Sequence, residues 1–205
     1  MAGSFRGAFG PKPFLRSVSL TILLGALVSI GGLVQARQKP VPIPEPDKAD
    51  IPLRGQRTAT DITYGDWRKL CFKAAGAKTL CRTSITGKFD TGQIAVRLDL
   101  IERDDGRARL QLLLPVGMYL QAGVKLSVDK GSPYPVPYTW CLANGCVAAE
   151  VAAPKFIREM ESGQTLGLQI VDTNILLVTT SVPLAQFAHV HKGAPENTFE
   201  QDIEE

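Results

Sequence analysis

Apolar and polar positions alternate through much of the chain, and the alternation is clearest in two neighbouring segments. In residues 94–100 and again in residues 108–114, every second side chain is apolar and most of those between are polar or small. This period of two is typical of a β-strand with one face toward a core. Arg103-Asp104-Asp105-Gly106 supplies a turn between them. The pattern predicts an antiparallel hairpin of strands 93–102 and 107–114.

The same alternation returns downstream. It covers residues 124–128, before a Lys130-Gly131 turn, and residues 166–170, before an Asp172-Thr173-Asn174 turn. The second turn leads into residues 175–181, which predicts a second hairpin. Because residues 175–178 are apolar on both faces, we expect this strand in the middle of a sheet.

One segment has a helical pattern instead. Pro154 can occupy the first turn, Phe156, Ile157 and Met160 share one side, and Gly163 can end the helix in a left-handed conformation. The other strands are predicted near residues 64–73, 79–86, 118–128, 138–143, 146–151 and 165–171. The expected fold class is therefore all-β, an antiparallel β-sandwich or barrel-like domain with one short helix.

The N-terminal residues carry an export pattern. Arg6, Lys12 and Arg16 precede an uncharged apolar run at 18–34, which ends in Val34-Gln35-Ala36. Small residues at the last and third-last positions are accepted by signal peptidase, so a signal peptide is predicted at 1–36. The alternative is an N-terminal membrane anchor, with membrane association through residues 18–34. Either alternative predicts an exported protein in the periplasm or at the cell surface.

Composition divides the rest of the chain into three parts. Residues 37–61 are rich in proline, which favours an extended linker. Residues 62–190 form the predicted β domain, of ordinary domain size. Residues 191–205 are expected to be an acidic disordered tail, because residues 193–205 hold five acids and no base.

The charge balance excludes one class of function. The formal net charge of +3 comes from the three bases of the leader, so residues 37–205 are neutral overall. A nucleic-acid-binding protein needs a surplus of cations to displace counterions from phosphates. We therefore expect no nucleic-acid partner.

The four cysteines are expected to form disulfides. An even number of cysteines in an oxidising compartment favours disulfides over thiols or zinc. The spacings do not fit a close zinc pair or a C-x-x-C redox site. Three pairings can be drawn, and local pairing is geometrically easiest because each pair brackets a turn: Cys71 with Cys81, and Cys141 with Cys146.

Several motifs in this order resemble the invasion-associated locus B family. They are Tyr64-Gly65-Asp66-Trp67 followed by Cys71 and Cys81, LPVGMYL at 114–120, C-x3-G-C at 141–146 and SVPLAQF at 181–187. The resemblance covers nearly all of residues 62–190. It implies an exported alphaproteobacterial envelope protein with a β domain and no established catalysis. The chain departs from the family pattern at Gln186, where glycine commonly precedes the phenylalanine.

Candidate chemistry is sparse. His189 and His191 could bind a metal from one face of a strand, but no third ligand is evident and an exposed, fraying terminus is the preferred interpretation. Asp104 and Asp105, beside Glu102, are interpreted as solvated turn residues. No phosphate loop, nucleophile elbow or HExxH motif is present. We predict no enzymatic activity, no catalytic, cofactor-binding or metal-binding residues, and no cofactor.

The aromatic residues are expected mainly in the core. Trp67 and Trp140 lie in or beside predicted strands, where a large ring is ordinarily buried. The stretch from Tyr134 to Tyr138, with prolines at 133, 135 and 137, is interpreted as a stiff exposed loop and a contact site.

The sequence therefore predicts a non-enzymatic exported envelope protein whose disulfide-linked β domain binds an envelope or host-surface protein. A first alternative is a membrane-anchored accessory subunit of an envelope membrane complex. A second is a metal-dependent envelope hydrolase.

Overall fold

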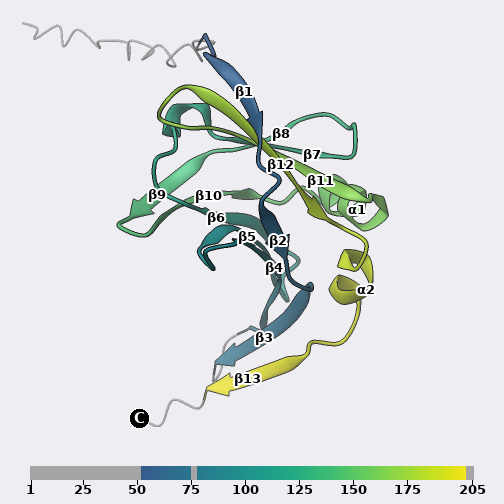
Figure 1. Cartoon of the computed structure of the whole chain (residues 1–205). Coiled ribbons are helices and arrows are strands. Elements are labelled where there is room, and N and C mark those ends of the chain that lie inside the picture. The colour runs from purple at the N-terminus through teal and green to yellow at the C-terminus, as the bar shows by residue number, and fades with distance from the viewer. Residues whose placement is uncertain (1–51, 75–77, 202–205) are drawn as a thin grey trace, which may run out of the picture. The chain divides into compact units, whose positions relative to one another are not determined.

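The computed structural model describes residues 52–74 and 78–201, and this part of the chain folds into two β-sheets with two short α-helices (Figure 1). The strands are β1 (Gly55–Thr58), β2 (Ile62–Tyr64), β3 (Arg68–Ala74), β4 (Leu80–Phe89), β5 (Ile94–Arg103), β6 (Ala108–Leu114), β7 (Val124–Val128), β8 (Tyr134–Val136), β9 (Tyr138–Leu142), β10 (Gly145–Val151), β11 (Thr165–Val171), β12 (Leu176–Pro183) and β13 (Asn197–Gln201). The helices are α1 (Pro154–Ser162) and α2 (Phe187–Lys192), and a 3-10 turn, η1, spans Leu120–Ala122.

Some predictions lie outside the described residues. They are the signal peptide or membrane anchor at 1–36, with its apolar run 18–34, and residues 37–51 of the linker. The tip of the first cysteine-bracketed turn (75–77) and residues 202–205 also lie outside. Within the part that the structure describes, neither helix has the length and apolar content that a bilayer span requires.

The two sheets are open and mostly antiparallel. The five-stranded sheet has the order β1-β12-β11-β7-β8. The eight-stranded sheet has the order β13-β3-β4-β5-β6-β10-β9, with β2 paired to β4. Only the two outermost segments of the described chain pair in parallel, β1 with β12 and β13 with β3. The all-β class is confirmed, and the sheets do not close into a barrel.

The core lies between the inner faces of the two sheets, with both helices on the core side. Fully buried leucines come from both sheets: Leu98, Leu100, Leu110, Leu112, Leu126, Leu166 and Leu168. Phe156 and Met160 reach this core from α1, and Phe187 reaches it from α2. The even-numbered apolar residues at 96–100 of β5 and 110–114 of β6 are thus the core-facing ones, as the alternation predicts, whereas Ile94 at the start of β5 is exposed.

Both predicted hairpins are confirmed. β5 pairs with β6 around a turn in which Gly106 has φ 79°. β11 pairs with β12 around Asp172, whose Oδ1 accepts hydrogen bonds from the N–H groups of Asn174 and Leu176 at 2.9 and 3.0 Å. The expectation that the second strand lies inside a sheet also holds, because β12 runs between β11 and β1.

The predicted helix is present as α1, with its apolar side on the core. Its end differs from the expectation, because Gly163 has φ −82° and is not left-handed. The predicted strand 118–128 is wrong in its first half. Gly117 and Gly123 take positive φ (85° and 63°), which breaks the extended conformation at both positions. The 3-10 turn η1 lies between these glycines, and β7 begins at Val124.

Both ends of the described chain are more structured than composition predicts. Residues 55–58, assigned to the linker, form β1. Residues 191–201, assigned to the disordered tail, complete α2 and form β13. In each case a partner strand far away in sequence supplies the pairing, so local proline or acid content was a poor guide.

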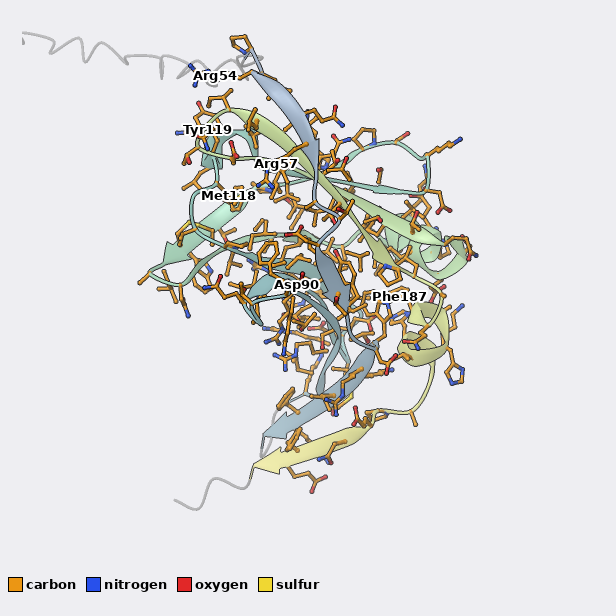
Figure 2. All side chains as sticks on the ribbon, viewed as in Figure 1. Arg54, Arg57, Asp90, Met118, Tyr119 and Phe187 are labelled. Atoms are coloured by element: carbon orange, nitrogen blue, oxygen red, sulfur yellow. A yellow bond between two sulfur atoms is a disulfide. The ribbon has the colours of Figure 1, made fainter. Side chains whose placement is uncertain are left out.

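Trp67 joins the eight-stranded sheet to the end of β12. Its indole Nε1–H donates to the Pro183 carbonyl at 2.8 Å, and its ring meets Phe187 edge-on with centroids 4.8 Å apart (Phe187 is labelled in Figure 2). Gln186 accepts from the Trp67 main-chain N–H and donates to Asp66, at 3.2 and 2.9 Å. The predicted burial of Trp67 is confirmed. Gln186, the departure from the resemblance, bonds the two motif segments together.

Replacing Phe187 tests whether α2 completes the core. Phe187→Ala should lower the free energy of unfolding by about 3–5 kcal/mol, because it empties a fully buried aromatic site. Phe199→Ala, at a side chain that is 46% exposed, is the matched control and should cost about 1 kcal/mol. Urea unfolding of both variants measures the difference. Equal losses would show that α2 is not part of the core.

Candidate interaction surface

The outer face of the eight-stranded sheet is built by the odd-numbered residues of β5 and β6 and their cross-strand partners. Arg82, Ile101 and Arg109 lie side by side on β4, β5 and β6. The next row along the strands holds Ser84, Asp99 and Gln111, and the row beyond it holds Thr86, Arg97 and Leu113. Arg103 lies opposite Leu80 at the other end. We call this surface the outer face.

The three middle strands of the outer face, β4 to β6, carry four arginines and one acid on this side. Arg97 Nε lies 3.0 Å from Asp99 Oδ1, and Arg82 Nε lies 3.9 Å from the same oxygen. Asp99 is only 3% exposed, and burial raises its pKa although both arginines oppose the shift. Among the described residues, Arg103 and Arg109 form no salt bridge. The face therefore has an excess of positive charge.

Apolar side chains flank the arginines at both margins. On one side Phe72 stacks on Phe199, with centroids 5.3 Å apart, and the Arg82 guanidinium lies 5.7 Å from the Phe72 ring centroid. On the other side Trp140 and Leu142 of β9 are 49% and 60% exposed. The predicted burial of Trp140 is wrong, because β9 is the edge strand and its outer side has no covering layer among the described residues.

The two disulfides are those predicted from local pairing. Cys71 bonds Cys81 across β3 and β4, and Cys141 bonds Cys146 across β9 and β10. Each pair consists of directly opposed residues with Cα atoms 4.0 Å apart. The disulfides therefore fix the register near opposite margins of the eight-stranded sheet.

The proposed contact loop has a different structure from the one expected. Tyr134 lies in β8 and Tyr138 begins β9, so this stretch is two short strands, with Val136 fully buried between them. Tyr134 stacks on Phe156 with centroids 4.3 Å apart and donates a hydrogen bond to the Val151 carbonyl. Burial raises the pKa of Tyr138. The prediction of an exposed loop is wrong, because the rings of Tyr134 and Tyr138 pack against the core. The role of this stretch as a contact site stays a prediction.

His191 is a structural link between elements, and the expectation of a fraying terminus is wrong for it. Its Nδ1 lies 2.9 Å from Glu161 on α1, and its Nε2 lies 2.9 Å from Glu102 on β5. Lys192 Nζ lies 3.0 Å from the other oxygen of Glu161. The two histidines were predicted to share one face of a strand. Because they lie on the helix α2, side chains two positions apart do not share a face, and His189 points away from His191.

The two carboxylates favour the protonated form of His191. An ionised carboxylate only accepts hydrogen bonds, so an imidazolium, in which both ring nitrogens donate, matches these two contacts. The pKa of His191 is raised, first by the hydrogen bond to Glu102 and then by the charges of Glu102 and Glu161, against the opposing effect of burial. Burial raises the pKa of Glu161, but hydrogen bonds from Lys192 and His191 outweigh it and lower the pKa overall.

The acidic turn residues act locally. Asp104 accepts a hydrogen bond from the Thr79 N–H at 2.8 Å, and Asp105 pairs with Arg107, which lowers the pKa of Asp105 to about 2. Within residues 52–74 and 78–201, no group of three or more His, Cys, Asp or Glu side chains is arranged to hold a metal ion.

Sequence reasoning missed the outer face. The usable signal was that Arg97, Arg103 and Arg109 occupy the polar positions of the two clearest alternating strands. Their convergence with Arg82 depends on the cross-strand register, which alternation alone does not give.

Comparisons with known proteins agree with this fold. The model of the family described as Invasion associated locus B (IalB) protein matches residues 67–195. Invasion protein B homologs of Brucella abortus strain 2308 and of biovar 1 strain 9-941 are each 25% identical over 134 residues, which is 65% of this chain and 72% of the relative.

A solved structure shows the same fold. The crystal structure of invasion associated protein B from Bartonella henselae matches with a TM-score of 0.56 and 22% identity, and covers 63% of this chain and 90% of that chain. Fold and surface together define a disulfide-bonded, open β domain with a basic, aromatic-edged sheet face. The chain belongs to the invasion-associated locus B family.

The His191 link should make stability depend on pH. Because the folded pKa of His191 is raised, its stabilising effect is fully present below the unfolded pKa of about 6.5 and is lost as pH rises through the folded value. The free energy of unfolding in urea should therefore fall, as pH rises above about 6.5, more steeply for the natural protein than for His191→Gln. His189→Gln is the control and should keep the steep fall. Identical profiles for the natural protein and His191→Gln would refute the link.

Proposed function

We propose that this protein is an exported, non-enzymatic envelope protein that works by binding another protein through the outer face. Two disulfides and membership of this family favour an exported protein. The observation that carries the binding role is the grouping of four arginines between aromatic margins. Arginine and aromatic residues are enriched at protein interfaces, whereas lysine and acids are depleted.

The partner surface that fits the outer face is acidic. Arg103 and Arg109 pair with no acid among the described residues, and a guanidinium binds a carboxylate through two parallel hydrogen bonds, which lysine cannot do. Asp99 is already bonded to Arg97 and too buried to repel an approaching acid strongly. Trp140 and Leu142 would add apolar contact at one margin.

The location of the partner follows from export and from the relatives. An exported protein meets other envelope proteins or, at the surface, host proteins. The relatives from Bartonella and Brucella are named as invasion proteins, which supports a host-surface protein as one class of partner. Within the envelope, the corresponding partner would be a neighbouring protein that presents an acidic surface.

Charge reversal on the outer face tests this proposal. The full chain, its Arg103→Glu/Arg109→Glu variant and a control, Arg158→Glu, are immobilised and exposed to envelope proteins and to host surface proteins. Arg158 is an exposed arginine on α1, away from the outer face. Acidic proteins retained by the natural chain and the control should be retained on the order of tenfold less by the double variant.

The salt dependence provides a second measurement. Retention should weaken as ionic strength rises, because exposed arginine–carboxylate pairs are screened. Equal retention by the double variant would contradict the proposed face. Retention of anionic lipid vesicles in place of protein, lost in the same variant, would contradict a protein partner while keeping the face.

A further inference from the structure

An uncharged groove of about 600 Å³ opens where the chain leaves one sheet for the other. β1 runs along β12 as far as Thr58, and the chain then crosses to β2 of the eight-stranded sheet (Figure 1). The groove lies beside the second half of β12, beyond the end of β1, and is lined there by Thr179, Thr180 and Ser181. Thr58, Thr60 and Tyr64 bound it from the crossing segment and β2.

The edge of β12 is unpaired inside this groove. β1 pairs with β12 only from Leu176 to Thr179, whereas β11 pairs with β12 as far as Pro183. The Thr179 carbonyl accepts from the Ala59 N–H at 2.8 Å, so its main-chain groups point to the β1 side. Because main-chain direction alternates along a strand, the N–H and C=O of Ser181 point to that side too.

Ser181 therefore presents an open donor and acceptor. On either side of Ser181, the main-chain carbonyls of β12 already accept hydrogen bonds. The Thr179 carbonyl accepts from the Ala59 N–H, and the Pro183 carbonyl accepts from the Trp67 indole N–H. Among the hydrogen bonds of the described residues, Ser181 has no partner on this side. The groove is lined by residues of both faces of β12 and by Thr165 of β11, so it covers the open edge of β12 and continues over one face of the sheet near Pro183.

We propose that an extended, uncharged peptide segment of a partner protein binds in this groove as an added strand beside Thr180–Pro183. The open main-chain groups of Ser181 would bond the peptide main chain, as in other cases of strand addition. The lining contains no charged residue, and its threonine and serine hydroxyls suit small or polar peptide side chains. About four peptide residues would span this half of β12, at roughly 3.3 Å per residue.

The test uses linear seven-residue peptides selected from a random phage-displayed library on the full chain. A selected peptide is synthesised, and its affinity is compared for the natural protein, Ser181→Pro and Ser181→Ala. Proline removes the N–H that faces the groove and leaves the β11 ladder intact, because Ser181 does not bond to β11. Affinity should fall about tenfold for Ser181→Pro and less than about twofold for Ser181→Ala.

Methylating the peptide gives a measurement that needs no variant of the protein. Single N-methylation along the peptide should abolish binding at one position only, because the Ser181 carbonyl is the one open acceptor on this edge and bonds a single peptide N–H. The Arg103→Glu/Arg109→Glu variant should bind the peptide normally, so this site and the outer face can fail separately.

Three results would overturn the proposal. They are the absence of any selected peptide, equal binding by Ser181→Pro with its fold intact by circular dichroism, and N-methylation effects at no position or equally at all positions. A Ser181 amide already protected from hydrogen exchange in the free full chain would also overturn it. That result would mean that another segment of this chain fills the groove.

Discussion

The contact between Trp67 and Pro183 links the eight-stranded sheet to the end of β12 at the margin of the shared core. The indole sits between the start of β3 and the end of β12, and Phe187 packs edge-on against it. A buried indole needs an acceptor for its N–H, and Pro183, at the edge of β12 that β1 leaves open, offers its carbonyl. The contact therefore joins the start of β3, the end of β12 and the first turn of α2. His191, one turn further along α2, stacks on Phe187.

The sequence was informative wherever a segment and its neighbour in the chain form a unit. The β5–β6 and β11–β12 hairpins and α1 have their turn residues, alternation and apolar side within one stretch. The two disulfides belong to the same group, because each joins the two strands of a hairpin. Local pattern and final structure agree there because the partner strand is only a turn away.

The remainder depends on partners that are distant in sequence. β1 and β13 have no strong strand pattern of their own, and Trp140 is exposed only because β9 is the last strand of its sheet. The neutral total charge concealed the excess of arginine on the outer face, since Glu102 and Glu161 lie on the core side with His191. Residue totals describe the chain, whereas the register determines which charges become neighbours.

The pairing of β1 with β12 and of β13 with β3 has a practical consequence for the limits of the domain. Residues 67–195, which the family model matches, omit both strands and also β2. A fragment cut at those limits would leave β12 and β3 with bare hydrogen-bonding edges, which template association between copies. β1 and β13 therefore belong to the domain, where they form one edge of each sheet. Recombinant versions should begin before Gly55 and extend past Gln201.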